Sequence, residues 1–200
     1  MTMDGKLLQR TISKAFPTNR VKSIVELLML FSIGLLVLVL RANVKIPLNI
    51  PGHHGILVMM LFMIGRASTE RKIASSYSAI AASFYLLFFY AGLKDLFLPL
   101  IYIIMGVAID CMFILTRKWN TMARLVIFVL IGGLAYMIIP FSRLIIHLST
   151  GFPYHTFLRN GYLIPHLSHF TFGAMGSFLG AGLILSFKKR KKIIYINLQH

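Results

Sequence analysis

Imidazole side chains gather in three short stretches of the sequence, and an imidazole can bind a metal ion or hydrogen-bond a small ligand. Six of the seven histidines lie on the side that the charge pattern assigns to the outside; they are His53, His54, His147, His155, His166 and His169. His166 and His169 are three residues apart and share a face if they lie in a helix. We hypothesise a zinc-, copper-, iron- or nickel-type site formed by four of them, His53, His54, His166 and His169. The alternative is a set of interfacial histidines whose polar tips meet the lipid head groups.

Asp110 is a carboxylate inside an apolar stretch, and inserting such a group at the centre of a membrane helix costs about 2.5–3.5 kcal/mol. We therefore expect it to face the interior of the protein and to have a partner. Basic residues within reach on the same predicted side are Arg66, Arg71, Arg117 and Arg124. An ion pair or a contact with a helix terminus is favoured over a proton relay, because no second carboxylate lies deep in the predicted spans.

The elements that must position these residues are apolar stretches, and crossing a bilayer takes roughly 20 residues per helix. Of the 200 residues, 58% are hydrophobic and 13% are charged. Six stretches are expected to span the membrane; they cover residues 24–40, 56–64, 73–93, 96–115, 125–141 and 162–187. The sequence thus predicts an all-α polytopic bundle over residues 24–187 in the cell membrane. A basic segment, 1–23, precedes it and a basic tail, 188–200, follows it.

The second of these stretches is short, and it reaches spanning length only if residues 46–55 also lie at membrane depth. That segment contains Pro47, Pro51 and Gly52, which remove backbone donors or loosen the chain. Irregular backbone at membrane depth needs protein or a polar cavity to satisfy it, and in transporters it often marks the binding site. The alternative is an ordinary external loop before a short helix.

The charge distribution predicts that both termini are cytoplasmic. The chain carries 21 Lys and Arg against 5 Asp and Glu. With the N-terminus inside, all but five basic residues fall on the cytoplasmic side; the five outside are Arg41, Lys45, Lys94, Arg143 and Arg159. Basic residues beside membrane spans meet anionic lipid, and this explanation is favoured over nucleic-acid binding.

Two further patterns concern the later spans. Residues 142–161 form a long predicted outer loop containing Tyr154, His155 and Arg159, which is either functional or an interfacial aromatic belt. In the last span, small residues recur every four positions, as in the rows Gly173–Ser177–Ala181 and Gly176–Gly180. Such rows let helices approach closely, either within the chain or between subunits.

Several of these features resemble one family, the substrate-binding S components of energy-coupling-factor transporters for vitamins and metals. The resemblance rests on six short spans, on the sequence IPLNIPG at 46–52, on GVAID at 106–110 and on the glycine-rich last span. The stretch 55–66, which ends in IGR, resembles the second span of the biotin-type members. The first span lacks the alanine-spaced row that many members have, and the chain lacks the N-terminal histidine segment of the nickel and cobalt members.

The resemblance implies a substrate site near the outer face and no catalysis or cofactor. The residues it maps to that site are Asn49, His53, His54, Tyr154, His155, Arg159, His166 and His169. Independently of the resemblance, the buried carboxylate of Asp110 and the small residues Gly173, Ser177 and Gly180 are expected to have structural or coupling roles. The resemblance also implies two partners, a membrane coupling subunit and a pair of ATPases that supply the energy.

We therefore expect a membrane-embedded binding subunit for uptake of a vitamin-like compound or a transition metal, with His53, His54, His166 and Arg159 lining one pocket. Two alternatives stay open. One is an integral membrane enzyme acting on lipid or isoprenoid phosphate head groups, with Arg143 or Arg159 on the phosphate. The other is an assembly factor without a ligand. The sequence has no G-x-x-x-x-G-K-[ST], H-E-x-x-H or G-x-S-x-G motif.

Reporter tags will test the predicted orientation. A tag at either terminus should report from the cytoplasm, because most basic residues then lie inside, and a tag inserted near Pro153 should report from outside. If the two termini report from opposite sides of the membrane, the six-span arrangement is wrong.

Overall fold

Every regular element in the described part of the chain is an α-helix. The computed structural model describes residues 18–44, 49–89, 95–116 and 121–197. Its helices are α2 (Thr18–Asn43), α3 (Gly55–Ala67), α4 (Ala74–Phe89), α5 (Leu98–Leu115), α6 (Thr121–Thr150), α7 (His155–Asn160) and α8 (Leu163–Asn197). The expectation of an all-α protein is confirmed.

Four of these helices, α2, α5, α6 and α8, are long and apolar enough to cross a membrane, and the apolar helices α3 and α4 are shorter. Large apolar side chains are exposed along them, among them Leu28, Phe88, Leu100 and Leu148. Exposed apolar surface on this scale belongs in lipid, because in water it would drive aggregation. The chain is therefore a multi-pass integral membrane protein.

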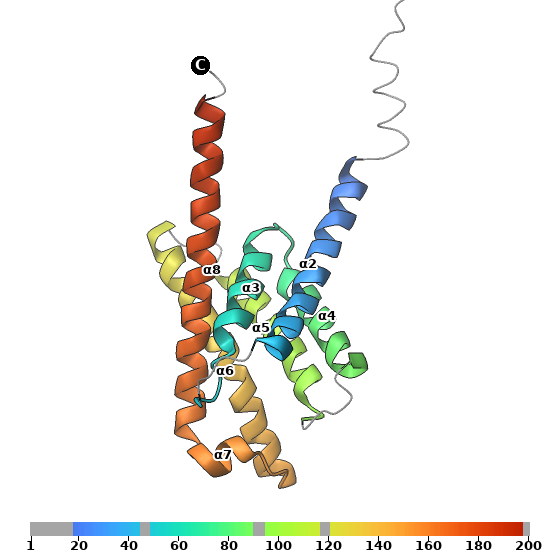
Figure 1. Cartoon of the computed structure of the whole chain (residues 1–200), viewed down its shortest axis with the longest axis vertical. Helices are drawn as coiled ribbons and strands as arrows, with labels where there is room; N and C mark the ends of the chain where they lie inside the picture. The colour runs from blue at the N-terminus through green and yellow to red at the C-terminus, as the bar shows by residue number, and fades with distance from the viewer. Residues whose placement is uncertain (1–17, 45–48, 90–94, 117–120, 198–200) are drawn as a thin grey trace, which may run out of the picture.

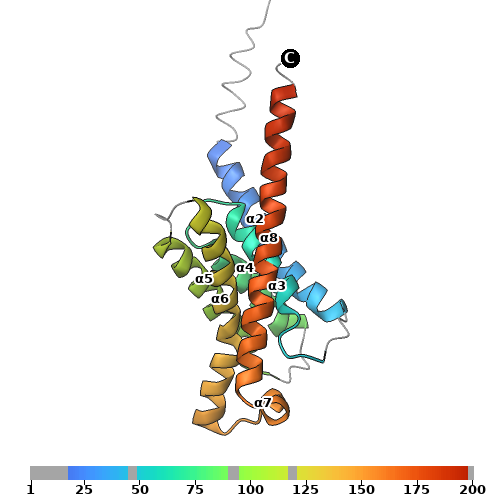
Figure 2. The ribbon, with the colours of Figure 1, turned by 90° about the vertical axis from the view of Figure 1, so that its left-hand side faces the viewer.

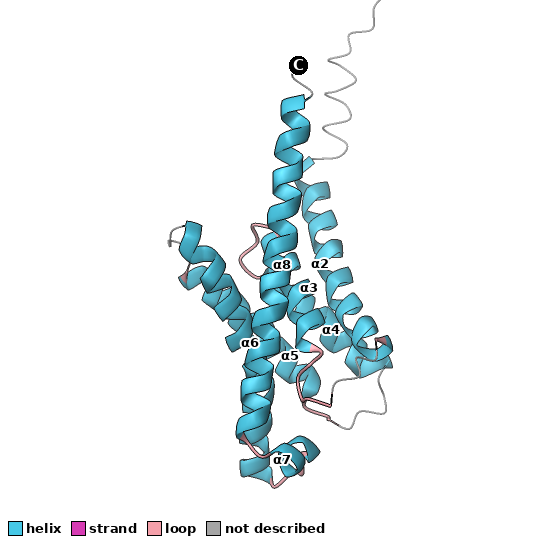
Figure 3. Cartoon of the chain, turned by 60° about the vertical axis from the view of Figure 1, so that its left-hand side comes forward, coloured by secondary structure: helices cyan, strands magenta, loops and turns pink. Residues whose placement is uncertain are grey.

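The helices form one bundle in which successive members run in alternating directions (Figure 1). The first turn of α2 and the last turn of α8 lie at one end, called the tail end below, and α7 lies at the other, called the α7 end (Figures 1 and 2). Helix α8 packs along α6 and α3, while α4 packs against α2 and α5. The first turns of α6 lean away from α8 (Figure 3).

Helix boundaries differ from the expected spans mainly in the C-terminal half. The predicted outer loop 142–161 is wrong over most of its length, because α6 continues through Pro140 to Thr150 and residues 155–160 form α7. Pro140 is buried, and neighbouring helices and side chains in a membrane bundle can compensate for the N–H that proline lacks. Helix α8 also extends past the predicted end of the last span to Asn197.

Small residues on α8 allow its close contact with α6 and α3. A Cβ atom added at Gly173 would lie 2.6 Å from the carbonyl oxygen of Gly132 on α6, and one added at Gly176 would lie 2.4 Å from that of Ile56 on α3. Ser177 is fully buried next to Gly132, and Gly180 faces Met60. The predicted rows of small residues therefore serve packing within the chain.

A matched pair of glycine substitutions will test this packing. Gly176→Ala should destabilise the protein by about 1–3 kcal/mol, because the new methyl group meets helix backbone that cannot move aside. Gly182→Ala should be neutral or slightly stabilising, because nothing lies within 4 Å of its added Cβ atom. Thermal unfolding of both variants in mild detergent is the measurement, and equal melting temperatures would show that the contact does not limit stability.

Candidate functional site

Asp110 binds the start of α4 at the tail end of the bundle. Its carboxylate accepts hydrogen bonds from the backbone N–H of Ser75 (3.0 Å), the backbone N–H of Ser76 (2.8 Å) and the Ser76 hydroxyl (2.7 Å). The side chain of Arg66 forms an ion pair with it, with Nε 3.3 Å from Oδ1. The carboxylate thus accepts hydrogen bonds from N–H groups at the start of α4 that have no partner inside this helix.

The connection between α3 and α4 is held by a second ion pair. Arg71 donates to Glu26 of α2 (3.0 Å) and also to the Ser23 carbonyl oxygen and hydroxyl. Arg66 in turn donates to the carbonyl oxygen of Arg71 (2.9 Å). Helices α2, α3, α4 and α5 are therefore joined at the tail end through a continuous set of polar contacts.

At the α7 end, Asp95 organises a smaller polar group. Arg143 of α6 donates to its Oδ2 at 2.8 Å, and the Tyr154 hydroxyl donates to its Oδ1 at 3.3 Å. Burial and the Asp95 charge raise the pKa of Tyr154 to about 12, so this hydroxyl stays protonated at neutral pH. Tyr154 was predicted to contact a ligand; its hydroxyl donates to Asp95 in this structure, and the ligand contact stays a prediction.

Residues around α7 form an aromatic cluster. The ring of Phe157 is stacked with that of His166, with centroids 6.4 Å apart, and also contacts Tyr162. His147, whose ring also contacts Phe157, donates a hydrogen bond from Nδ1–H to the Phe152 carbonyl oxygen (2.8 Å). The other two predicted site residues here, His155 and Arg159, are exposed on α7.

The turn before α3 packs against α8. Gly52 has a φ of +84°, and a Cβ atom there would lie 2.6 Å from the His169 ring. His169 is buried, stacks on Tyr136 and lies 2.7 Å from the Pro165 carbonyl oxygen through Nδ1. His169 therefore holds this turn in place. Asn49, at the start of the turn, is exposed.

The four histidines predicted to bind a metal are divided between different surroundings. His53 and His54 have ring centroids 4.1 Å apart, whereas His166 packs against Phe157 and His169 against Tyr136. Within the described ranges, no three His, Cys, Asp or Glu side chains lie close enough together to share a metal ion. The geometry gives the four-histidine metal site no support.

A cavity of about 240 Å³ lies beside His54 at the α7 end. Its walls come from α2, α4, α5 and the residue before α3; they are Leu38, Arg41, Ala42, His54, Tyr85, Leu86 and Leu98. Arg41 donates to the hydroxyl of Tyr102 at 2.5 Å. The Nδ1 atom of His54 is buried and has no hydrogen-bond partner among the described residues.

This cavity differs from the expected pocket. Of the four residues predicted to share one pocket, only His54 lines it, while His53, His166 and Arg159 lie elsewhere. Arg41 and Tyr85, which also line the cavity, were not among the predicted site residues. Arg41 had a usable signal, since it is the basic residue that directly follows the first span, but Tyr85 is one of many aromatic residues in its helix and had none.

Comparison with known proteins adds no assignment: no family model, no curated protein and no solved structure matches this chain. The fold by itself assigns the chain to the class of helical multi-pass membrane proteins.

Substitutions at Asp110 will separate its hydrogen bonds from its charge. Asp110→Leu should destabilise the protein by about 3–5 kcal/mol, because Arg66 and the Ser75 and Ser76 N–H groups lose their buried acceptor. Asp110→Asn keeps one carbonyl oxygen and should cost clearly less. Melting temperatures in detergent provide the measurement. If all three proteins melt together, the carboxylate has no structural role.

Proposed function

We propose that this protein is a membrane-embedded binding subunit for a small neutral or anionic molecule, and that the cavity beside His54 is its binding site. The observation that carries the proposal is a buried imidazole nitrogen without a protein partner, in the wall of a cavity that also contains a guanidinium group. Buried polar atoms in folded proteins nearly always have a partner, and a bound ligand supplies one.

The lining of the cavity indicates the kind of ligand. Leu38, Leu86 and Leu98 supply apolar surface, Tyr85 an aromatic ring, and Arg41 a positive charge. None of the lining residues that the structure describes is acidic. Burial and the neighbouring His53 lower the pKa of His54 to about 4, so its imidazole is neutral at pH 7 and offers one donor and one acceptor. A compact organic molecule with a carboxylate or another acceptor group fits this chemistry.

The size and ligand set favour an organic molecule over a metal ion. The volume of about 240 Å³ lies just below the usual range for small-molecule sites, roughly 300–1,000 Å³, so the ligand is small. A transition metal needs several nitrogen, sulfur or carboxylate ligands, and this lining offers one imidazole.

We also propose that the protein takes up its ligand together with a coupling subunit and an ATPase pair. Only the sequence resemblance supports this part of the proposal. The alternative of an enzyme acting on phosphate head groups gains no support from Arg143, which pairs with Asp95 and does not line the cavity beside His54. In an assembly factor without a ligand, only water in the cavity could pair with the His54 nitrogen.

Ligand binding can be tested directly on the purified protein. Mass spectrometry of small molecules released after purification in mild detergent identifies the ligand, which is then titrated back. Arg41→Gln and His54→Ala should each weaken binding by about tenfold or more, because a hydrogen bond to a charged group is worth roughly 1.5–3 kcal/mol.

The matched controls are His53→Ala and His166→Ala, which remove neighbouring imidazoles that do not line the cavity. Both should bind the ligand like the unmodified protein, and all variants should be monodisperse. Unchanged affinity in a monodisperse Arg41→Gln, His54→Ala double variant would refute the site. Loss of binding in His166→Ala alone would return the site to the α7 cluster.

A further inference from the structure

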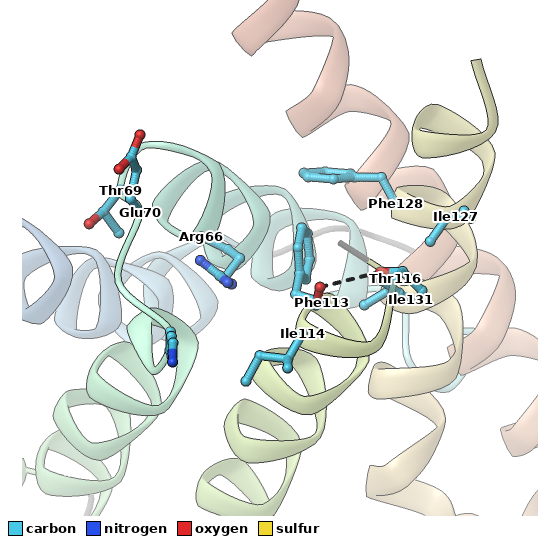
Figure 4. Close-up of a pocket in the computed structure, with 10 residues that line it drawn as sticks. Arg66, Thr69, Glu70, Phe113, Ile114, Thr116, Ile127, Phe128 and Ile131 are labelled. Atoms are coloured by element: carbon cyan, nitrogen blue, oxygen red, sulfur yellow. Dashed lines mark hydrogen bonds between the residues drawn. The ribbon is translucent and has the colours of Figure 1, made fainter. Parts of the chain in front are cut away.

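A larger cavity, of about 570 Å³, lies at the tail end of the bundle, whereas the proposed binding site lies at the α7 end. Figure 4 shows the larger cavity with its lining residues. This cavity lies between the connection of α3 and α4, the end of α5 and the first turns of α6. The residues that line it are Arg66, Thr69, Glu70, Lys72, Phe113, Ile114, Thr116, Ile127, Phe128 and Ile131.

The lining is divided into a polar rim and an apolar wall. The rim comes from Arg66 in the last turn of α3, from Thr69, Glu70 and Lys72 in the segment after α3, and from Thr116 after α5. The wall comes from Phe113 and Ile114 of α5 and from residues 127–131 of α6. A ligand that fills this cavity must itself be polar at one end and apolar at the other.

The apolar wall continues into the surface that faces lipid. Ile114 lines the cavity and is also 48% exposed, and the next residue, Leu115, is 77% exposed. On α6, Val126 and Leu130 are exposed on either side of the lining residues Ile127 and Phe128. In a bilayer these exposed side chains contact acyl chains, and they lie next to the apolar residues that line the cavity.

One cation of the rim, Arg66, is held in place by several contacts. Arg66 is fixed by Asp110 and by the Arg71 carbonyl oxygen, and its guanidinium lies 4.8 Å from the centre of the Phe113 ring. Lys72 is exposed and adds a second positive charge. Glu70 also lines the rim, and Figure 4 shows its carboxylate directed away from Arg66 and Phe113.

We propose that this cavity binds one phospholipid molecule, with the phosphate on Lys72 and Arg66 and an acyl chain along Ile127, Phe128 and Ile131. Lysine and arginine are the side chains that most often bind phosphate, and basic residues beside a membrane are attracted to anionic lipid head groups. The proposal uses no residue of the His54 cavity, and it stands or falls separately from the proposed function.

The test measures lipid binding to the delipidated full-length protein in mild detergent by native mass spectrometry. The probes are dioctanoyl phosphatidylglycerol, dioctanoylglycerol (which lacks the phosphate) and inorganic phosphate. Lys72→Gln removes a rim charge and Ile127→Trp fills the apolar part of the cavity. Their controls are Lys22→Gln, an exposed lysine outside this cavity, and Val126→Trp, the exposed neighbour on α6.

The expected result is one phosphatidylglycerol per protein, bound about tenfold more weakly by Lys72→Gln and Ile127→Trp and unchanged in both controls. Three results would overturn the proposal: equal binding in all variants, which indicates only general lipid contact; equal binding of dioctanoylglycerol; or binding of inorganic phosphate as tight as that of the lipid. Melting temperatures identify any variant that fails to fold, and Lys72→Gln, an exposed substitution, keeps the test decisive if Ile127→Trp is unstable.

Discussion

The carboxylate of Asp110 accepts the first backbone N–H groups of α4 and pairs with Arg66 at the end of α3. These groups are buried, and a buried charge or a buried N–H group without a partner is costly, so the contact is needed to keep them inside the bundle. Since Asp110 belongs to α5, one side chain fixes three helices relative to one another. The neighbouring pair of Arg71 and Glu26 adds α2. The ion pair with Asp110 also places Arg66 in the rim of the large cavity.

Close contact of helix backbones is the second constraint, and it determines which helices are neighbours. Apolar side chains gain little by packing on one another instead of on lipid, so helices associate where small residues allow close van der Waals contact. The rows on α8 do this twice, with Gly173 and Ser177 against α6 and Gly176 and Gly180 against α3. The first turns of α6 lie beyond this contact and diverge from α8, and the large cavity borders that region (Figure 3).

The two ends of the bundle have different chemistry as a result. Toward the α7 end, a small cavity combines one guanidinium, one neutral imidazole and apolar walls, which suits a compact acceptor-bearing molecule. At the tail end, a larger cavity combines cations with a wall that continues into the lipid-facing surface, which suits an amphiphile. Asp95 compensates Arg143 near the first cavity, and Asp110 compensates Arg66 at the second. The two cavities can therefore be tested separately, because no residue lines both.

The sequence by itself determined the membrane class, the approximate position of each apolar helix and the need for Asp110 to have a partner, because hydrophobic length and the cost of a buried charge are local properties. It did not determine how far α6 continues past Pro140, since neighbouring helices decide whether a missing N–H is tolerated. Nor did it determine which polar residues share a site. Arg41, His54 and Tyr85 come from three separate segments and meet only through helix packing, while His166 and His169, three residues apart, point into different surroundings. Only the tertiary structure decides such groupings, because they depend on which helix faces approach one another.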